Sequence, residues 1–181
     1  MFKARECALQ YNIITSSHGV EAPILEADMD ANLTSLFTAA ETWCTQRGEK
    51  LTPIRRDVLG LLLAQGTSMK AYDILSALQK QKPNAAPPTV YRALDFLVTL
   101  GLAHRLDSLN AFVACTDYSA PHHGVLLICE QCHGVTELPP TAWADAMHHD
   151  AHRHGFEIAG HELEIRGRCS ACRTQNTQVM A

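Results

Sequence analysis

Two pairs of cysteines constrain this chain more than any other feature. Each pair is separated by two residues: Cys129 and Cys132 form the first, and Cys169 and Cys172 the second. This spacing lets both thiolates of a pair bind one metal ion from a single turn, and two pairs supply the four sulfurs of a tetrahedral zinc site. The alternatives are free thiols or disulfides, which this spacing does not favour. We therefore expect two distant segments to meet around one structural zinc.

The composition is that of an ordinary globular protein. The chain has 181 residues, of which 46% are hydrophobic and 19% charged, enough for one good-sized domain or two small ones. No apolar run approaches the roughly 20 residues that span a bilayer, and residues 1–7 lack a secretory signal. We expect a cytoplasmic protein whose thiols stay reduced and bind metal.

Charge and metal-binding residue types are unevenly distributed. The net charge is −4, yet residues 31–115 alone carry +3, between a segment of −3 and one of −4. This basic middle segment permits DNA binding there. Nine of the 10 histidines lie at or beyond His104, in the same part of the chain as five of the 7 cysteines.

The first 115 residues predict helices followed by a hairpin. Residues 1–30 lack periodicity and are expected to form a mobile extension. Thr52 with Pro53 predicts one helix start, and Thr89 is expected to cap another. Helices over residues 32–47, 53–66, 69–81 (burying Tyr72) and 90–100 are expected, with strands over 102–106 and 111–114. This order is the outline of a winged helix–turn–helix domain over residues 31–115.

The remaining segment, residues 116–181, predicts an α+β domain. Strands are expected over residues 124–129 and 134–138, a helix over 142–154, and a third strand within 156–168. The buried positions expected in that last segment are Ile158, Leu163 and Ile165. The histidines of the helix are expected to be solvated, with a weak zinc site as the alternative: His148, His149, His152 and His154.

The helix over residues 90–100 is the candidate DNA-reading element. Its period turns Tyr91 and Arg92 outward, opposite a core face of Val90, Leu94, Leu97 and Val98. Arg92 is placed to bind a guanine edge and Tyr91 a thymine methyl or a phosphate. The alternative is an ordinary amphipathic helix with Arg92 paired to Asp95. Further expected DNA contacts are Thr89, Lys50, Arg55, Arg56 and Lys70.

A second set of metal-binding residue types lies at the junction of the two halves: His104, Cys115, His122, His123 and Glu137. Each has an ordinary explanation, such as a small buried cysteine or a solvated glutamate. Together they are the nitrogen, sulfur and oxygen ligands that zinc accepts. The residues alone leave these two interpretations open.

Several segments resemble the ferric uptake regulator superfamily. They are Leu51–Arg56, Ala71–Leu75, the two cysteine pairs and, above all, Pro87–Leu97, which reads PPTVYRALDFL. The resemblance covers about residues 31–173 and is strongest with the zinc-sensing branch. It implies a homodimer with N-terminal winged-helix domains and C-terminal α/β dimerisation domains.

The resemblance also implies two Zn²⁺ ions per protomer. The cysteine site is structural, and a regulatory site maps to His104, Cys115, His122 and Glu137, with His123 as a substitute for His122. Iron-sensing relatives take a histidine from the loop matching residues 66–68, which has none here, and the sequence after His123 lacks their Asp and last His. A cysteine ligand at position 115 favours zinc over iron or manganese.

These observations predict a zinc-responsive transcriptional repressor. It is expected to bind palindromic operator DNA as a homodimer when the regulatory site is filled, and to control zinc uptake genes. It is not expected to be an enzyme, to have a small-molecule substrate or to contact a membrane. The alternatives are a regulator of iron or manganese, a zinc hydrolase with Glu137 as general base, and a zinc-ribbon interaction module.

Overall fold

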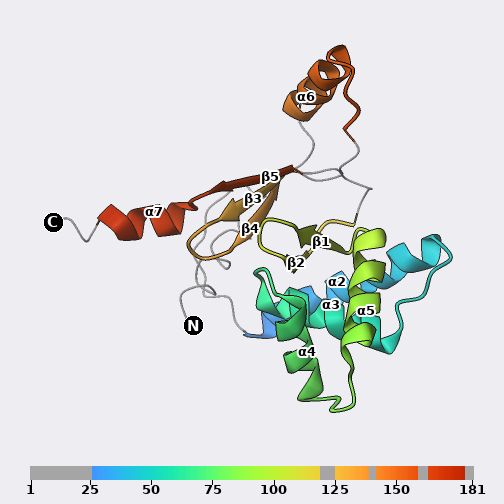
Figure 1. The fold of residues 1–181 in the computed structure, drawn as a ribbon. Coiled ribbons are helices and arrows are strands. Elements are labelled where there is room, and N and C mark those ends of the chain that lie inside the picture. The colour runs from blue at the N-terminus through green and yellow to red at the C-terminus, as the bar shows by residue number, and fades with distance from the viewer. Residues whose placement is uncertain (1–25, 119–124, 139–141, 159–162, 178–181) are drawn as a thin grey trace. The chain divides into compact units, whose positions relative to one another are not determined.

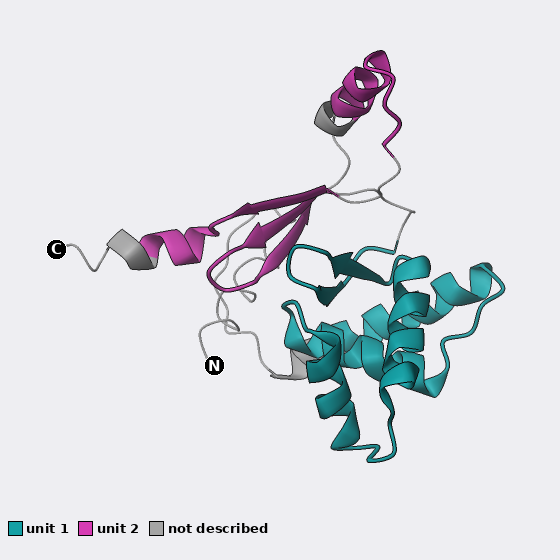
Figure 2. Ribbon diagram, in the orientation of Figure 1, with its two compact units in different colours: residues 1–119 teal, residues 120–181 magenta. Residues whose placement is uncertain are grey.

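The computed structural model describes residues 26–118, 125–138, 142–158 and 163–177 (Figure 1). The chain divides into two compact units, residues 1–119 and 120–181 (Figure 2). The domain boundaries expected after residues 30 and 115 stay predictions. Most of the expected N-terminal extension lies outside the described residues, as do His122 and His123.

The described part of the first unit begins with four helices. They are α2 (Glu26–Gln46), α3 (Pro53–Gln65), α4 (Ala71–Gln79) and α5 (Pro87–Thr99). The start of α3 after Thr52 is confirmed, and Gly66 closes it in a left-handed conformation with φ 64°. The expected start of α2 at Asn32 is wrong, because the helix already begins at Glu26.

The predicted cap of α5 at Thr89 is also wrong. The helix begins at Pro87, with Ala86 as the capping residue, so that Thr89 lies inside its first turn. Two prolines can open a helix because their φ is already helical and because the first N–H groups of a helix have no partner within it. The proline pair therefore determines where α5 begins.

The expected hairpin follows α5. Strands β1 (Ala103–Leu106) and β2 (Ala111–Ala114) pair antiparallel, with His104 opposite Val113. Two backbone hydrogen bonds of 2.8 Å join Met69, before α4, to Phe112 of β2. The first unit thus contains the helix–turn–helix pair α4–α5 followed by a two-stranded wing.

Leucine side chains dominate the core of this unit. On α5, Val90, Leu94 and Leu97 are at most 1% exposed, which confirms three of the four predicted inward positions. The fourth, Val98, is half-buried. The prediction that Tyr72 is buried is wrong, since this side chain is 72% exposed. The buried stripe of α4 consists of Ile74, Leu75 and Leu78. The helical period places Tyr72 on the same side as Leu75 but far from Ile74, so Tyr72 falls outside the side that packs against the core.

The described part of the second unit contains a three-stranded sheet and two helices. The strands are β3 (Val125–Cys129), β4 (Val135–Leu138) and β5 (Leu163–Gly167), in the order β4-β3-β5. Strand β3 is antiparallel to β4 and parallel to β5. The helices are α6 (Ala142–Arg153), as expected, and α7 (Ser170–Thr177), which the sequence did not predict.

One expected buried position in this unit is wrong. Ile165 on β5 is 41% exposed, whereas Leu163 and Ile158 are half-buried. Among the described residues, no helix combines the length and the apolar character needed to cross a membrane.

Candidate functional site

The sheet of the second unit brings the two cysteine pairs together. Strand β3 ends at Cys129, which lies opposite Gly167 at the end of β5. Because the two strands are parallel, the turn after β3 and the segment after β5 both start from the carboxyl ends of the strands, on the same end of the sheet. The backbone N–H of Glu130 donates to the Gly167 carbonyl at 2.9 Å and continues this pairing. The sulfurs of the four cysteines therefore all lie within 4.8 Å of one another.

The spacing of these sulfurs fits a zinc ion. Tetrahedral zinc with Zn–S bonds of about 2.3 Å places its sulfurs about 3.8 Å apart, and Sγ of Cys132 lies 3.9 Å from Sγ of Cys169. A Cβ atom on Gly134 would lie 3.3 Å from Sγ of Cys132, so a glycine suits the tight turn beside the sulfurs. These four residues can hold zinc with the closed coordination typical of structural sites.

The protein backbone already favours a thiolate at one of the four positions. Burial raises the pKa of the Cys129 thiol, but hydrogen bonds from the backbone N–H groups of Cys169, Cys132 and Gln131 outweigh it and lower this pKa to about 6. The N–H of Cys169 lies 3.4 Å from Sγ of Cys129. Burial, with hydrogen bonds to the other three thiols, raises the pKa of Cys172 to about 12.

Two residues of the second predicted metal set lie together in the first unit. His104 on β1 and Cys115 after β2 share one face of the hairpin, and their ligand atoms lie within 4.8 Å of each other. Both are buried, with exposures of 3% and 1%. Sγ of Cys115 also lies 3.1 Å from the Asp117 carbonyl oxygen, to which the thiol donates. A buried imidazole beside a buried thiol is a donor pair that zinc accepts.

The other members of this set belong to the second unit. Glu137 is half-buried on β4, opposite Leu126 of β3. His122 and its predicted substitute His123 lie outside the described residues.

The sequence did not single out Tyr118, which follows Cys115. Its side chain is 8% exposed, and its hydroxyl has no hydrogen-bond partner among the described residues. Burial raises the pKa of this phenol, and the Cys115 and Cys44 thiols add to the effect. No pattern in the sequence marks the residue, because a tyrosine in a loop after a strand is usually exposed.

The outer face of α5 presents the predicted DNA-reading side chains to solvent. Tyr91 is 45% exposed and Arg92 is exposed, while Thr89 is half-buried. Among the described residues, no ion pair joins Arg92 to Asp95. A shallow hollow between α4 and α5 is lined by Tyr91 and the exposed Tyr72. Tyr72, predicted to be buried, is thus a neighbour of the predicted DNA-reading face.

The predicted phosphate-binding residues differ in their surroundings. Lys50 and Lys70 are exposed at the starts of α3 and α4. Arg55 stacks on Phe96 of α5, with its guanidinium carbon 3.3 Å from the ring centroid, and it donates to the Lys50 carbonyl at 2.7 Å. It therefore joins α3 to α5.

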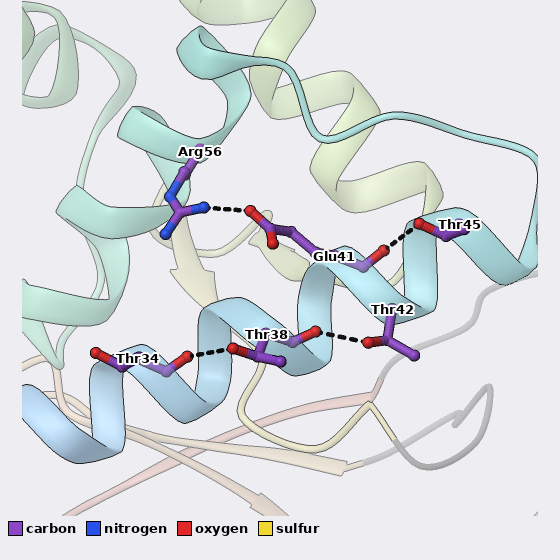
Figure 3. A network of polar contacts seen from close by, with 6 residues as sticks. All are labelled: Thr34, Thr38, Glu41, Thr42, Thr45 and Arg56. Atoms are coloured by element: carbon purple, nitrogen blue, oxygen red, sulfur yellow. Dashed lines mark hydrogen bonds and ion pairs between the residues drawn. The ribbon is translucent and has the colours of Figure 1, made fainter.

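Arg56 points toward α2, where it forms an ion pair with Glu41 (Figure 3). The same view shows the threonines of α2, whose hydroxyls donate to carbonyls one turn earlier: Thr38 to Thr34, Thr42 to Thr38 and Thr45 to Glu41. Arg56 and Glu41 are both about half-exposed, at 46% and 47%, so solvent screens their attraction and the pair is weak.

Comparison with known proteins identifies the family. The family model described as the ferric uptake regulator family matches residues 46–166. The zinc uptake regulation protein of Escherichia coli (strain K12) is 41% identical over 138 residues, which cover 76% of this chain and 81% of that protein.

Two solved structures extend this likeness to three dimensions. A zinc uptake regulator complexed with zinc and DNA matches with a TM-score of 0.74 and 38% identity, over 80% of this chain and 97% of that one. The holo form of XcZur matches with a TM-score of 0.71 and 42% identity, over 77% and 98%. By sequence and by fold, this chain belongs to the ferric uptake regulator family.

Proposed function

We propose that the protein is a zinc-responsive transcriptional repressor that binds operator DNA as a homodimer. The observation that carries the proposal is the outer face of α5, which presents Tyr91 and Arg92 in the second helix of a helix–turn–helix. The relative that was solved with both zinc and DNA supports the same function. Such a regulator acts on chromosomal DNA, so we place it in the cytoplasm, with zinc uptake genes as its targets.

The first turns of α5 enter the major groove in this proposal. Arg92 donates two hydrogen bonds to a guanine, which discriminates against other bases by about 1–3 kcal/mol. Tyr91 contacts a neighbouring base or phosphate, Tyr72 extends this contact from α4, and Thr89 binds at the start of α5. Lys50 and Lys70 bind phosphates and make the affinity dependent on salt.

Arg55 and Arg56 have more than one role in this interface. Arg55 holds α5 against α3 through its stack on Phe96, so it supports the position of the reading helix as well as adding positive charge. Arg56 exchanges Glu41 for a DNA phosphate. This exchange costs little because the Arg56–Glu41 pair is exposed and weak.

The sheet of the second unit provides the surface for a second copy. Its register places Leu127, Leu138, Leu163 and Ile165 on one face, across three neighbouring strands. Leu138 and Ile165 are 38% and 41% exposed. Burying apolar area stabilises association by about 25 cal/mol per Å² before the entropic cost of binding. Pairing of this face between protomers sets two α5 helices at the spacing of a palindromic operator.

Zinc occupies two sites per protomer in this proposal. The site of Cys129, Cys132, Cys169 and Cys172 is structural and holds the turn after β3 to the start of α7. The regulatory site consists of His104, Cys115, His122 and Glu137, with ligands from both units. Zinc in this second site favours one arrangement of the DNA-binding unit relative to the dimerisation unit. Moving a switch from 1:99 to 99:1 requires about 5.5 kcal/mol of differential binding.

A zinc hydrolase is the less favoured alternative. Catalysis needs an open coordination position for water, and the proposed regulatory set of four ligands leaves none. Cys115 also favours a zinc sensor over an iron or manganese sensor, because a thiolate ligand suits zinc better than either of these metals.

The test uses Cys115→Ser, with Cys44→Ser as the matched control. Cys44 is equally buried, at 1% exposure, in the same unit but in neither metal set. Zinc per protomer is measured by elemental mass spectrometry after purification with zinc. We expect the count to fall from about two to about one in Cys115→Ser and to stay at about two in Cys44→Ser. An unchanged count in Cys115→Ser removes Cys115 from the coordination shell.

DNA binding is tested with a palindromic duplex selected from a random library by the zinc-loaded protein. Fluorescence anisotropy should show that Arg92→Ala loses about 5–150-fold in affinity, the equivalent of 1–3 kcal/mol. Asp95→Ala, on the same helix, should bind at least as well as wild type. Binding by Cys115→Ser should no longer respond to zinc. If no duplex can be selected, or if Arg92→Ala binds normally, the protein does not act on DNA through α5.

A further inference from the structure

A stripe of metal-binding side chains runs along one side of α6. The helix spans Ala142–Arg153 and carries Asp145, His148, His149 and His152. Each residue of an α-helix is turned by about 100° from the one before it, so these four positions fall within an arc of about 100°. All four side chains are exposed. None of them belongs to the two metal sets described above.

The opposite side of α6 has a different character. Met147 and Ala151 are half-buried there, and the exposed Arg153 pairs with Asp150 at 3.4 Å outside the histidine stripe. The helix therefore has an apolar side and a side of imidazoles and one carboxylate. An amphipathic helix turns its polar residues to one side, and on α6 three of these residues are histidines, whose imidazoles can bind a metal ion.

The spacing of the stripe matches that of a helical metal site. His148 and His152 are four residues apart, which places their Cβ atoms about 5–6 Å from each other on adjacent turns. Two histidines at this spacing bind zinc from one face of a helix. Asp145 lies three residues before His148, and His149 lies three before His152, so either can supply a further ligand. Imidazole suits zinc, copper and nickel alike.

The site differs from the cysteine site in strength. In the described part of the chain, three donors of this stripe do not meet within 4.8 Å, as the four cysteines do. Exposed side chains must rotate to close around a metal, which costs conformational entropy. With two imidazoles and water as the other ligands, the site binds zinc more weakly than a closed four-thiolate site.

We propose that His148 and His152 of α6 form a separate, weaker binding site for a divalent transition metal ion, with Zn²⁺ as the probe. The site is filled after the tighter ones and links two successive turns of α6. Helices of fewer than about 12–15 residues are marginal alone, and α6 has 12. Metal binding therefore stabilises the helix. This inference does not depend on the proposed repressor function.

The test is a zinc titration of the full-length protein after its tight sites have been filled and free zinc removed. Isothermal calorimetry should show a weaker binding event in wild type, with a gain of helical circular dichroism. We expect His148→Gln/His152→Gln to weaken this event at least about tenfold, since even losing a group that merely supports a metal ligand costs 10–100-fold. His154→Gln is the matched control, an exposed histidine just after the end of α6, and should bind as wild type does.

Three outcomes would overturn the proposal. They are the absence of a weak event in wild type, its persistence in the double variant, and its equal loss in His154→Gln. Elemental analysis after dialysis guards against misfolding, because the double variant should keep the same tightly bound zinc as wild type.

Discussion

Replacing Tyr118 with phenylalanine is expected to stabilise the first unit. The side chain is 8% exposed, and within the part of the chain that the structure describes its hydroxyl has no hydrogen-bond partner. Burying a hydroxyl without a partner costs about 1–3 kcal/mol in proteins. Phenylalanine keeps the ring and removes only the oxygen, at the cost of that atom's packing contacts. We therefore expect Tyr118→Phe to raise the free energy of unfolding by about 1–2 kcal/mol.

The same residue predicts a dependence on alkaline pH. Burial, with the Cys115 and Cys44 thiols, raises the pKa of Tyr118 in the folded state, whereas the unfolded phenol titrates near about pH 10. Above that pH the unfolded chain releases a proton that the folded chain keeps. The free energy of unfolding of the wild type is therefore unaffected by Tyr118 ionisation below about pH 10, and it falls by up to about 1.4 kcal/mol per pH unit above it. Tyr118→Phe has no such proton, so its advantage should widen as pH rises.

Urea unfolding at about pH 8 and about pH 10.5, followed by tryptophan fluorescence, measures both effects. Trp43 lies in the core of the same unit and reports on it. Tyr91→Phe is the control, because Tyr91 is 45% exposed and its removal should change neither the stability nor its pH slope. A Tyr118→Phe variant that is neutral or destabilised at pH 8, or that keeps the wild-type slope, would refute the account of an unpaired hydroxyl.

Arg55→Lys keeps the charge but loses the planar stack on Phe96, so the free energy of unfolding in urea should fall by about 0.5–2 kcal/mol; an unchanged value would mean that the stack contributes nothing. Gly101→Ala should lower the free energy of unfolding by about 1–2 kcal/mol in the same assay, because the φ of Gly101 is +70°. Its surroundings are open, so the cost comes from the backbone alone. Gly167→Ala, with open space and no positive φ, should be close to neutral, and equal effects of the two substitutions would contradict this reasoning. Ile165→Asp should shift the proposed homodimer toward monomer in analytical ultracentrifugation, and a dimer of unchanged affinity would place the interface elsewhere.

Much of the site was readable from local sequence. The apolar period of residues 90–100 predicted which side of α5 is buried, and the structure confirms that Arg92 and Tyr91 face solvent. The helical period is set by neighbours along the chain, so no knowledge of the tertiary structure is needed. The spacing within each cysteine pair predicted a metal-binding turn for the same reason.

Other features depended on contacts between distant residues. Tyr72 fits an apolar pattern with Leu75 and Leu78, but packing selects the stripe that contains Ile74 and leaves Tyr72 exposed. Helix α7 carries little apolar sequence of its own, and it begins directly after Cys169. The exposure of Ile165 likewise depends on which surface covers β5.

Local sequence suffices to predict the spacing within the cysteine pairs and the two faces of α5, because each depends on residues within a few positions. Whether the two pairs meet depends instead on how distant strands pair. Parallel pairing of β3 with β5 sets Cys129 opposite Gly167. The two segments that follow these strands therefore start at the same end of the sheet, and their cysteine sulfurs lie together. Strand partners and their direction come from burial shared between distant segments, which no local pattern encodes.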